Sequence, residues 1–179
     1  SDVYKRQELF DKYQSEIGGS GSRGEFIKYV LAQQGKQYVW GAEGPDTFDC
    51  SGLIMWALKQ VGIQFPHYTG DQWGATDHIN EKEARPGDLV FFGPGASRHV
   101  GMYTKPGEMF NASSPNAYGP GNGIGYSPYA APDLLGFARI KQLNDGGGGP
   151  GKSFQGKWDQ AISTAAAQMK VPITASDIR

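Results

Sequence analysis

PDTFDCSGLIMWAL, running from Pro45 to Leu58, is the stretch that decides the fold, and it contains the only cysteine among the 179 residues. From residue 51 to residue 61 apolar side chains recur at helical spacing, and Gly62 ends the pattern. Cys50 is therefore expected at the N-terminus of a helix. That position lowers the pKa of a thiol and favours the reactive thiolate, although a lone cysteine is also common as a small hydrophobic core residue.

The composition is that of an ordinary globular protein of about one domain. Apolar residues make up 38% and charged residues 20% of the chain, and the formal net charge is −1. This balance gives no basic surface for nucleic acid, and no apolar run approaches the roughly 20 residues of a membrane helix. Residues 1–17 lack the apolar core of a signal peptide. A single cysteine excludes an internal disulfide framework and a multi-thiolate metal site, so we expect no metal and no other cofactor.

Glycine-rich stretches divide the chain into segments. Residues 1–23 are expected to form an N-terminal tail, in which SDVYKRQ (1–7) is interpreted as the translation of a transposon-end sequencing adaptor and GGSGSRG (18–24) as a flexible joint. The folded domain is expected over 24–142, followed by a glycine-rich linker over 143–156. Residues 157–179 contain one apolar helical pattern and the start of another. This is too little to bury an apolar face, so we expect the truncated start of a second domain.

Within 24–142, helices come first and strands follow. A helix begins at about residue 25 in EFIKYVLAQQG, and the cysteine helix comes next. Strands are expected over 88–93, 99–104, 108–113 and 134–140, separated by proline- and glycine-rich turns. This order is typical of an α+β domain with an antiparallel sheet. The glycine- and proline-rich segment 114–132 is expected to form a surface loop that influences substrate choice.

A histidine and an asparagine on neighbouring strands are candidate partners for the thiol. His99 begins one expected strand, and Asn111 lies on the next, twelve residues later and across a turn. If the two strands form a hairpin, the asparagine can hold the imidazole in the orientation that activates Cys50. Each residue also has an ordinary interpretation. Cys50 can be an inert core thiol, His99 a surface histidine and Asn111 an edge-strand residue. The pattern therefore permits a Cys-His-Asn catalytic set without requiring it.

The order of several motifs resembles that of one family. DCSGLIMWAL is preceded by YVWGAEGPDTF and followed by RPGDLVFFG and RHVGMY. This combination, over about residues 24–140, resembles the NlpC/p60-type cell-wall cysteine peptidases. The resemblance implies a papain-like fold in which N-terminal helices, including the nucleophile helix, pack on an antiparallel sheet. It also implies Cys50 as nucleophile, His99 as general base and Asn111 as the third polar residue.

The same resemblance implies further residues around the nucleophile. Tyr38, in YVWG, matches the tyrosine that shapes the oxyanion and substrate region. Asp49 and Ser51 match residues that contact the free amino terminus of a stem peptide, because a carboxylate pairs with an ammonium group; an equal alternative for Asp49 is capping of the helix. His67 and Gln72 lie in FPHYTGDQWG, where family members carry a substrate-groove loop. The resemblance makes this pair candidates for lining the groove, although surface placement is the favoured expectation.

The implied activity is hydrolysis of peptidoglycan stem peptides through a thiolate acyl-enzyme, at the bond between D-glutamate and diaminopimelate or lysine. An amidase or another peptide specificity on the same triad is an alternative, and so is a non-catalytic wall-binding or structural module. Residues 157–179 resemble the start of a lysozyme-like transglycosylase domain of phage tail proteins. We therefore expect a peptidoglycan partner, no nucleic acid, no membrane insertion, and a location at the cell wall or on a virion tail within a larger protein.

Overall fold

The computed structural model describes residues 21–114 and 123–145. Within them, helices α2 and α3 come before the strands of the main sheet, as the sequence predicts. The elements in chain order are α2 (Ser22–Leu31), β1 (Gln37–Tyr38), β2 (Thr47–Phe48), α3 (Cys50–Gln60), α4 (Thr69–Gly74), β3 (Asp77–Ile79), η1 (Glu81–Glu83), β4 (Leu89–Phe92), η2 (Pro94–Ala96), β5 (His99–Lys105), β6 (Glu108–Ser113), β7 (Gly123–Pro128) and β8 (Leu134–Arg139).

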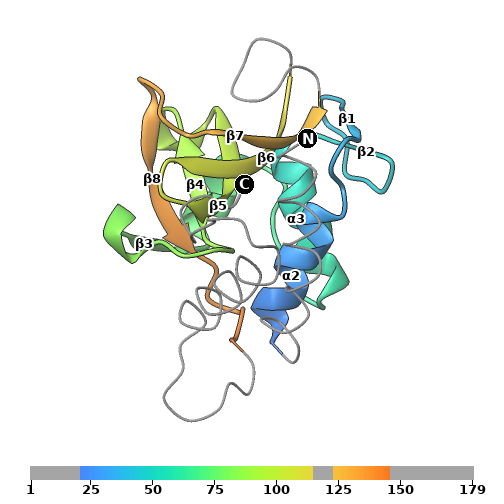
Figure 1. Cartoon of the computed structure of the whole chain (residues 1–179), viewed down its shortest axis with the longest axis horizontal. Coiled ribbons are helices and arrows are strands. Elements are labelled where there is room, and N and C mark those ends of the chain that lie inside the picture. Colours follow the sequence, from blue (N-terminus) through green and yellow to red (C-terminus); the bar gives the residue numbers. More distant parts are fainter. Residues whose placement is uncertain (1–20, 115–122, 146–179) are drawn as a thin grey trace, which may run out of the picture.

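Six strands form one antiparallel sheet in the order β3-β8-β4-β5-β6-β7 (Figure 1). β5 and β6 form the expected hairpin, with Met102 opposite Phe110. β4 and β8 are the other two expected strands, whereas the short edge strand β3 was not predicted. A separate pair of parallel strands, β1 and β2, joins Tyr38 to Phe48 just before the cysteine helix. The sheet and its helices confirm the α+β fold class.

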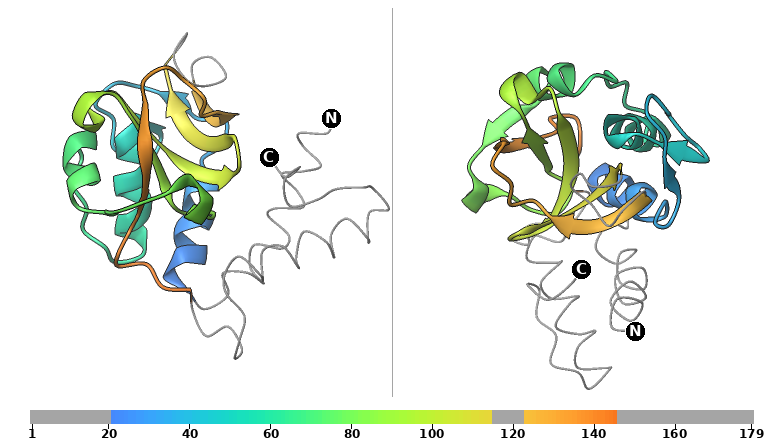
Figure 2. Two further views of the ribbon diagram at one scale, coloured as in Figure 1. Left: turned by 90° about the vertical axis from the view of Figure 1, so that its left-hand side faces the viewer. Right: turned by 90° about the horizontal axis from the view of Figure 1, so that it is seen from above.

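The two long helices α2 and α3 cover one face of this sheet, as Figures 1 and 2 show. Side chains alternate along β4, as a strand buried on both faces requires. Leu89 and Phe91 belong to the core shared with the helices, while Val90 and Phe92 belong to a second cluster on the opposite face. Helix α3 contacts both strands of the β5-β6 hairpin. The cysteine helix therefore packs against the hairpin that carries His99 and Asn111.

Residues Gly123–Pro128 form strand β7, which corrects the expectation that 114–132 is a surface loop. β7 pairs with the whole of β6, from Glu108 opposite Pro128 to Ser113 opposite Gly123. Every residue of β6 is buried, so its outer edge needs a hydrogen-bonding partner. Glycine and proline in this segment hide the strand from pattern analysis because both are rare in strands. Residues 115–122 lie outside the described residues.

Helix α2 begins at Ser22, so part of the expected flexible joint over 18–24 is helical. Arg23 accounts for this difference, because it is only 1% exposed and its guanidinium pairs with Asp88 at 3.3 Å and with Asp145 at 2.8 Å. The backbone N–H of Arg23 also donates to the carbonyl of Asn144. These contacts join residues 22–23 to residues 144–145, next to the expected domain limits at 24 and 142.

Residues 1–20 and 146–179 lie outside the described residues. The adaptor interpretation of 1–7, most of the linker over 143–156 and the lysozyme-like second domain over 157–179 therefore stay predictions. In the described part of the chain, no helix combines the length and the apolar character needed to cross a membrane.

Candidate active site

Cys50 is the first residue of α3, as the sequence predicts. The preceding residue, Asp49, caps the helix. Its Oδ1 accepts hydrogen bonds from the backbone N–H of Gly52 at 2.6 Å and from the Ser51 hydroxyl at 3.3 Å. Its Oδ2 accepts from the backbone N–H of Gly41 at 3.0 Å. The carboxylate thus ties the cysteine helix to the loop that follows β1.

The same carboxylate has a further partner in His67. Nε2 of His67 lies 3.0 Å from Oδ1 and 3.2 Å from Oδ2 of Asp49, and Nδ1 of His67 lies 2.9 Å from Oε1 of Glu43. His67 therefore bridges two carboxylates beside the cysteine, and its side chain is 30% exposed. Because Asp49 already accepts hydrogen bonds from several protein groups, its contacts favour the capping interpretation over the binding of a substrate ammonium.

His99 and Asn111 meet across the β5-β6 hairpin. Nε2 of His99 lies 2.7 Å from Oδ1 of Asn111, and the two residues are 4% and 1% exposed. The ring of Phe92 packs beside the imidazole, with ring centroids 5.5 Å apart. The contact that the hairpin predicts is therefore present, and it is shielded from water.

The surroundings of Asn111 decide which tautomer His99 adopts. The Asn111 amide nitrogen donates to the Ser127 hydroxyl at 2.8 Å and to the carbonyl oxygen of Gly125 at 3.3 Å, both on β7. A carbonyl oxygen only accepts hydrogen bonds, so the amide nitrogen must face Gly125 and Oδ1 must face His99. This arrangement requires a proton on Nε2 of the imidazole. Nδ1 of neutral His99 is then unprotonated and able to accept a proton.

The Cys50 thiol lies against the start of β5. The backbone N–H of Val100, the residue after His99, lies close enough to favour the thiolate, as do the N–H groups of Ser51 and of Cys50 itself. Burial nevertheless raises the pKa of the Cys50 thiol to about 11, and the negative charge of Asp49 adds to the rise. The three N–H groups lower this pKa without outweighing burial.

The pKa of His99 is shifted in the opposite direction. Burial lowers the pKa of its imidazole to about 4, although the hydrogen bond to Asn111 and the charge of Asp133 favour the protonated form. At neutral pH the resting pair is therefore a neutral thiol and a neutral imidazole. This differs from the sequence-based expectation that the position at the helix N-terminus favours the thiolate.

Tyr38 lies beside the thiol at the end of β1. Burial, followed by the charges of Cys50 and Asp49, raises the pKa of Tyr38 to about 12. The phenol therefore keeps its proton at neutral pH and remains a hydrogen-bond donor. A donor next to a nucleophile can stabilise the negative charge that develops on a carbonyl oxygen under attack.

A pocket of about 510 Å³ opens at the N-terminal end of α3. Two solvent-exposed aromatic side chains stand in its wall, Trp40 at 86% and Tyr68 at 55% exposed. Within residues 21–114 and 123–145, no group of three or more histidine, cysteine, aspartate or glutamate residues is arranged to hold a metal ion. The pocket is also lined by five residues singled out in the sequence, namely Tyr38, Asp49, Cys50, Ser51 and His67.

Gln72 lies behind this pocket rather than on the surface, which corrects the sequence-based expectation. It is fully buried, and its Nε2 donates to the backbone carbonyls of Ser51 at 3.1 Å and Pro66 at 2.8 Å. Gln72 therefore links the first turn of α3 to the segment that carries His67, and it supports the pocket from within the core.

Two residues that shape the site were missed in the sequence. Ser127 orients Asn111 from β7, and Glu43 holds His67 from the loop between β1 and β2. Each acts through a partner many residues away, so neither carries a local signal. Recognising β7 as a strand next to the hairpin is the step that would have pointed to Ser127.

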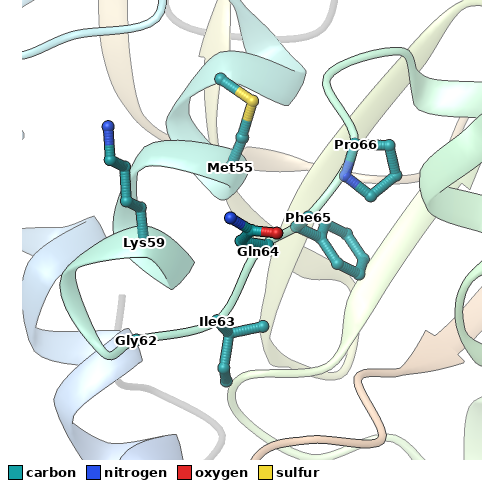
Figure 3. Close-up of a pocket in the computed structure, with 7 residues that line it drawn as sticks. All are labelled: Met55, Lys59, Gly62, Ile63, Gln64, Phe65 and Pro66. Atoms are coloured by element: carbon teal, nitrogen blue, oxygen red, sulfur yellow. The ribbon is translucent and has the colours of Figure 1, made fainter.

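A larger pocket of about 710 Å³ lies beside the C-terminal half of α3 (Figure 3). Met55 and Lys59 of α3 and the segment 62–66 line it. Of the described residues in its wall, only Lys59 is titratable. The pocket at the N-terminal end of α3 is instead lined by the titratable residues Tyr38, Cys50 and His67, among others.

Comparisons with known proteins agree with this geometry. The NlpC/P60 family profile matches residues 35–128, which include Cys50, His99, Asn111 and β7. The chain belongs to the NlpC/P60 family. The bifunctional muramidase/DL-endopeptidase CwlT of Bacillus subtilis is 41% identical over 141 residues, which cover 73% of this chain and 41% of CwlT. This NlpC/P60 chain thus spans about two fifths of the length of that relative.

Solved structures of the family share the fold. The P60 domain of an antigen from M. avium subspecies paratuberculosis superposes with a TM-score of 0.59 at 35% identity, over 65% of this chain and 92% of that domain. RipD of Mycobacterium tuberculosis, a non-catalytic NlpC/p60 domain protein adapted to peptidoglycan binding, superposes with a TM-score of 0.58 at 24% identity, over 68% of this chain and 98% of RipD. The likeness to RipD concerns the fold alone.

Proposed function

We propose that this domain is a cysteine endopeptidase that hydrolyses the stem peptides of peptidoglycan, at the bond between D-glutamate and the third residue, diaminopimelate or lysine. Its family membership and its similarity to a DL-endopeptidase support the class of substrate and of bond. The proposed place of action is the bacterial cell wall. Association with a phage tail stays a prediction from the C-terminal sequence.

The observation that carries the proposal is the orientation of His99. Oδ1 of Asn111, held by β7, accepts a hydrogen bond from Nε2–H and leaves Nδ1 as the basic nitrogen. The Cys50 sulfur lies against the backbone of Val100, directly after this histidine. A nucleophile beside a base that is itself oriented by a third group is the arrangement required for covalent catalysis of acyl transfer.

The proposed reaction begins when the Cys50 sulfur attacks the peptide carbonyl while Nδ1 of His99 takes the thiol proton. The tetrahedral intermediate then collapses, the C–N bond breaks, and His99 gives the proton to the leaving amine. Water, deprotonated by His99, hydrolyses the resulting thioester and restores the thiol.

In the proposed reaction, two donors stabilise the oxyanion of this intermediate. The backbone N–H of Cys50 lies at the helix start, where the helix dipole adds partial positive charge. The Tyr38 hydroxyl keeps its proton because its pKa is about 12. The hydrogen bond from either donor strengthens as negative charge develops on the carbonyl oxygen. This stabilises the transition state more than the substrate.

The test is digestion of purified peptidoglycan of the diaminopimelate and the lysine type, with Cys50→Ala in parallel and the products identified by mass spectrometry. The proposal expects fragments from the wild type alone, with a new amino terminus on the third stem residue. Fragments that end in a free lactyl group would assign an amidase instead. Binding without release by both proteins, with the wild-type thiol reduced, would assign a wall-binding module.

A further inference from the structure

We propose that His67 is a positioning residue for the nucleophile: held between Asp49 and Glu43, its imidazolium neutralises the carboxylate that caps the cysteine helix and thereby favours the Cys50 thiolate. The inference rests on the proposed function, because it takes Cys50 as the nucleophile. Its test reads the thiol directly and does not depend on cleavage of any peptide.

The need for such a residue follows from the position of Asp49. Its carboxylate caps α3 one residue before the nucleophile, and it also holds Gly41. The same negative charge opposes ionisation of the Cys50 thiol. The carboxylate that caps the helix at the cysteine therefore hinders formation of the thiolate, unless a positive charge neutralises it.

The geometry around His67 calls for that positive charge. Both ring nitrogens face carboxylate oxygens, Nε2 toward Asp49 at 3.0 Å and Nδ1 toward Glu43 at 2.9 Å. An ionised carboxylate only accepts hydrogen bonds, so both nitrogens must carry a proton to complete the two contacts. An imidazole with two protons is the cation. The bridge between two carboxylates thus selects the charged form of His67.

The electrostatic surroundings act in the same direction. Partial burial disfavours the cation, but the hydrogen bond and charge of Asp49, followed by those of Glu43, outweigh burial and raise the pKa of His67. The other ionisable groups in the pocket wall are Tyr38, Cys50, Tyr68 and Arg98. Tyr38 is neutral at neutral pH, and Arg98 lies 3.6 Å from Asp133. The imidazolium therefore persists to a higher pH than that of an ordinary histidine.

The test measures the rate at which iodoacetamide alkylates Cys50 from about pH 5 to about pH 10, because only the thiolate reacts well. In His67→Gln the thiol pKa rises by about one unit, which slows alkylation about tenfold near pH 6. The two rates converge at higher pH, where the wild-type imidazolium loses its proton. His67→Lys keeps a cation and restores most of the rate. A merely structural role would not produce this pH dependence.

His78→Gln is the matched control, because His78 lies on β3 and stacks on Trp73 with ring centroids 3.4 Å apart. Its alkylation profile is expected to coincide with that of the wild type. Glu43→Gln removes one of the two carboxylates that stabilise the imidazolium. The change in alkylation rate that accompanies deprotonation of His67 therefore moves to lower pH. Thermal unfolding of each variant establishes that it is folded.

Equal alkylation rates for wild type and His67→Gln at every pH would overturn the proposal. If His67→Gln does not fold, Glu43→Gln decides, and an unshifted pH profile refutes the role of His67. The outcome is separable from the proposed function. A wild type that cuts no peptidoglycan but shows the His67 effect on alkylation defeats the endopeptidase assignment and leaves this inference standing.

Discussion

Replacing Asn111 by alanine is expected to disable His99 while leaving the protein folded. The amide makes three hydrogen bonds, to His99 at 2.7 Å, to Ser127 at 2.8 Å and to Gly125 at 3.3 Å. Their loss, at about 1 kcal/mol each, destabilises the native state by about 3 kcal/mol. Small domains typically have about 5–15 kcal/mol of stability. Asn111→Ala should therefore fold, with a lowered midpoint of thermal unfolding.

Although Asn111→Ala should stay folded, its kcat should fall. Without Oδ1 of Asn111, nothing selects the tautomer of neutral His99 that has its proton on Nε2. The imidazolium formed during attack also loses its acceptor, and a hydrogen bond to a charged group contributes about 1.5–3 kcal/mol. This range corresponds to a fall of about 10- to 150-fold in kcat. KM should change little, because Asn111 is 1% exposed and cannot reach a substrate.

The assay is release of soluble fragments from purified peptidoglycan, with kcat and KM determined for folded protein at a temperature below the unfolding midpoint. Asn80→Ala is a suitable control, because Asn80 is an exposed asparagine beside β3, at the opposite edge of the sheet from β7. That variant should keep its activity. Wild-type kcat in Asn111→Ala, with the expected loss of stability, would refute the tautomer argument. Ser127→Ala should give a smaller loss of the same kind.

Three further predictions concern pH, the helix contact and the pocket wall. Because burial lowers the pKa of His99 from 6.5 to about 4, the acid limb of kcat/KM should lie well below pH 6.5, and an acid limb at that value would contradict the neutral pair. Gly52→Ala places a methyl group on a backbone carbonyl oxygen. Thermal and denaturant unfolding should therefore show that the free energy of unfolding falls by about 3 kcal/mol. In the control Gly74→Ala the added methyl group meets nothing within 4 Å, so the stability should not change. Trp40→Ala should leave the unfolding temperature unchanged but raise KM for peptidoglycan about fivefold; an equal rise in Leu135→Ala, which lies on β8 outside the pocket, would count against a binding role.

The elements that the sequence predicts best are those whose signals are local. Helix α3 starts at Cys50 because Asp49 supplies the cap and the apolar spacing begins directly after it. Strand β6 has the predicted limits, since a compact apolar run lies between a proline-glycine turn and a polar segment. The hairpin that brings His99 to Asn111 follows from the short turn between these strands. In each case neighbours in sequence decide the structure.

The features that the sequence does not predict depend on distant partners. Gln72 reads as a surface residue, yet it is buried because carbonyl groups of two other segments accept its amide hydrogens. His67 finds its carboxylates eighteen residues away in Asp49 and also in Glu43. Arg23 lies in a glycine-rich stretch but is buried by its ion pair with Asp88. Polar and charged residues of these types are usually exposed, so the sequence predicts a surface position. Contacts with distant segments bury them wholly or partly here.

In the proposed mechanism, the burial of Cys50 and His99 explains why the third residue, Asn111, matters. An imidazolium carries protons on both nitrogens, so a preformed thiolate-imidazolium pair would have no tautomer to select. Here the pKa values of about 11 for Cys50 and about 4 for His99 keep both groups neutral at rest. A neutral imidazole acts as a base toward the thiol only if its proton lies on the far nitrogen. Asn111 imposes that tautomer, and it can do so because β7 accepts its amide hydrogens. In the proposed mechanism, the glycine-rich segment that pattern analysis assigns to a loop thus determines which nitrogen of His99 receives the thiol proton.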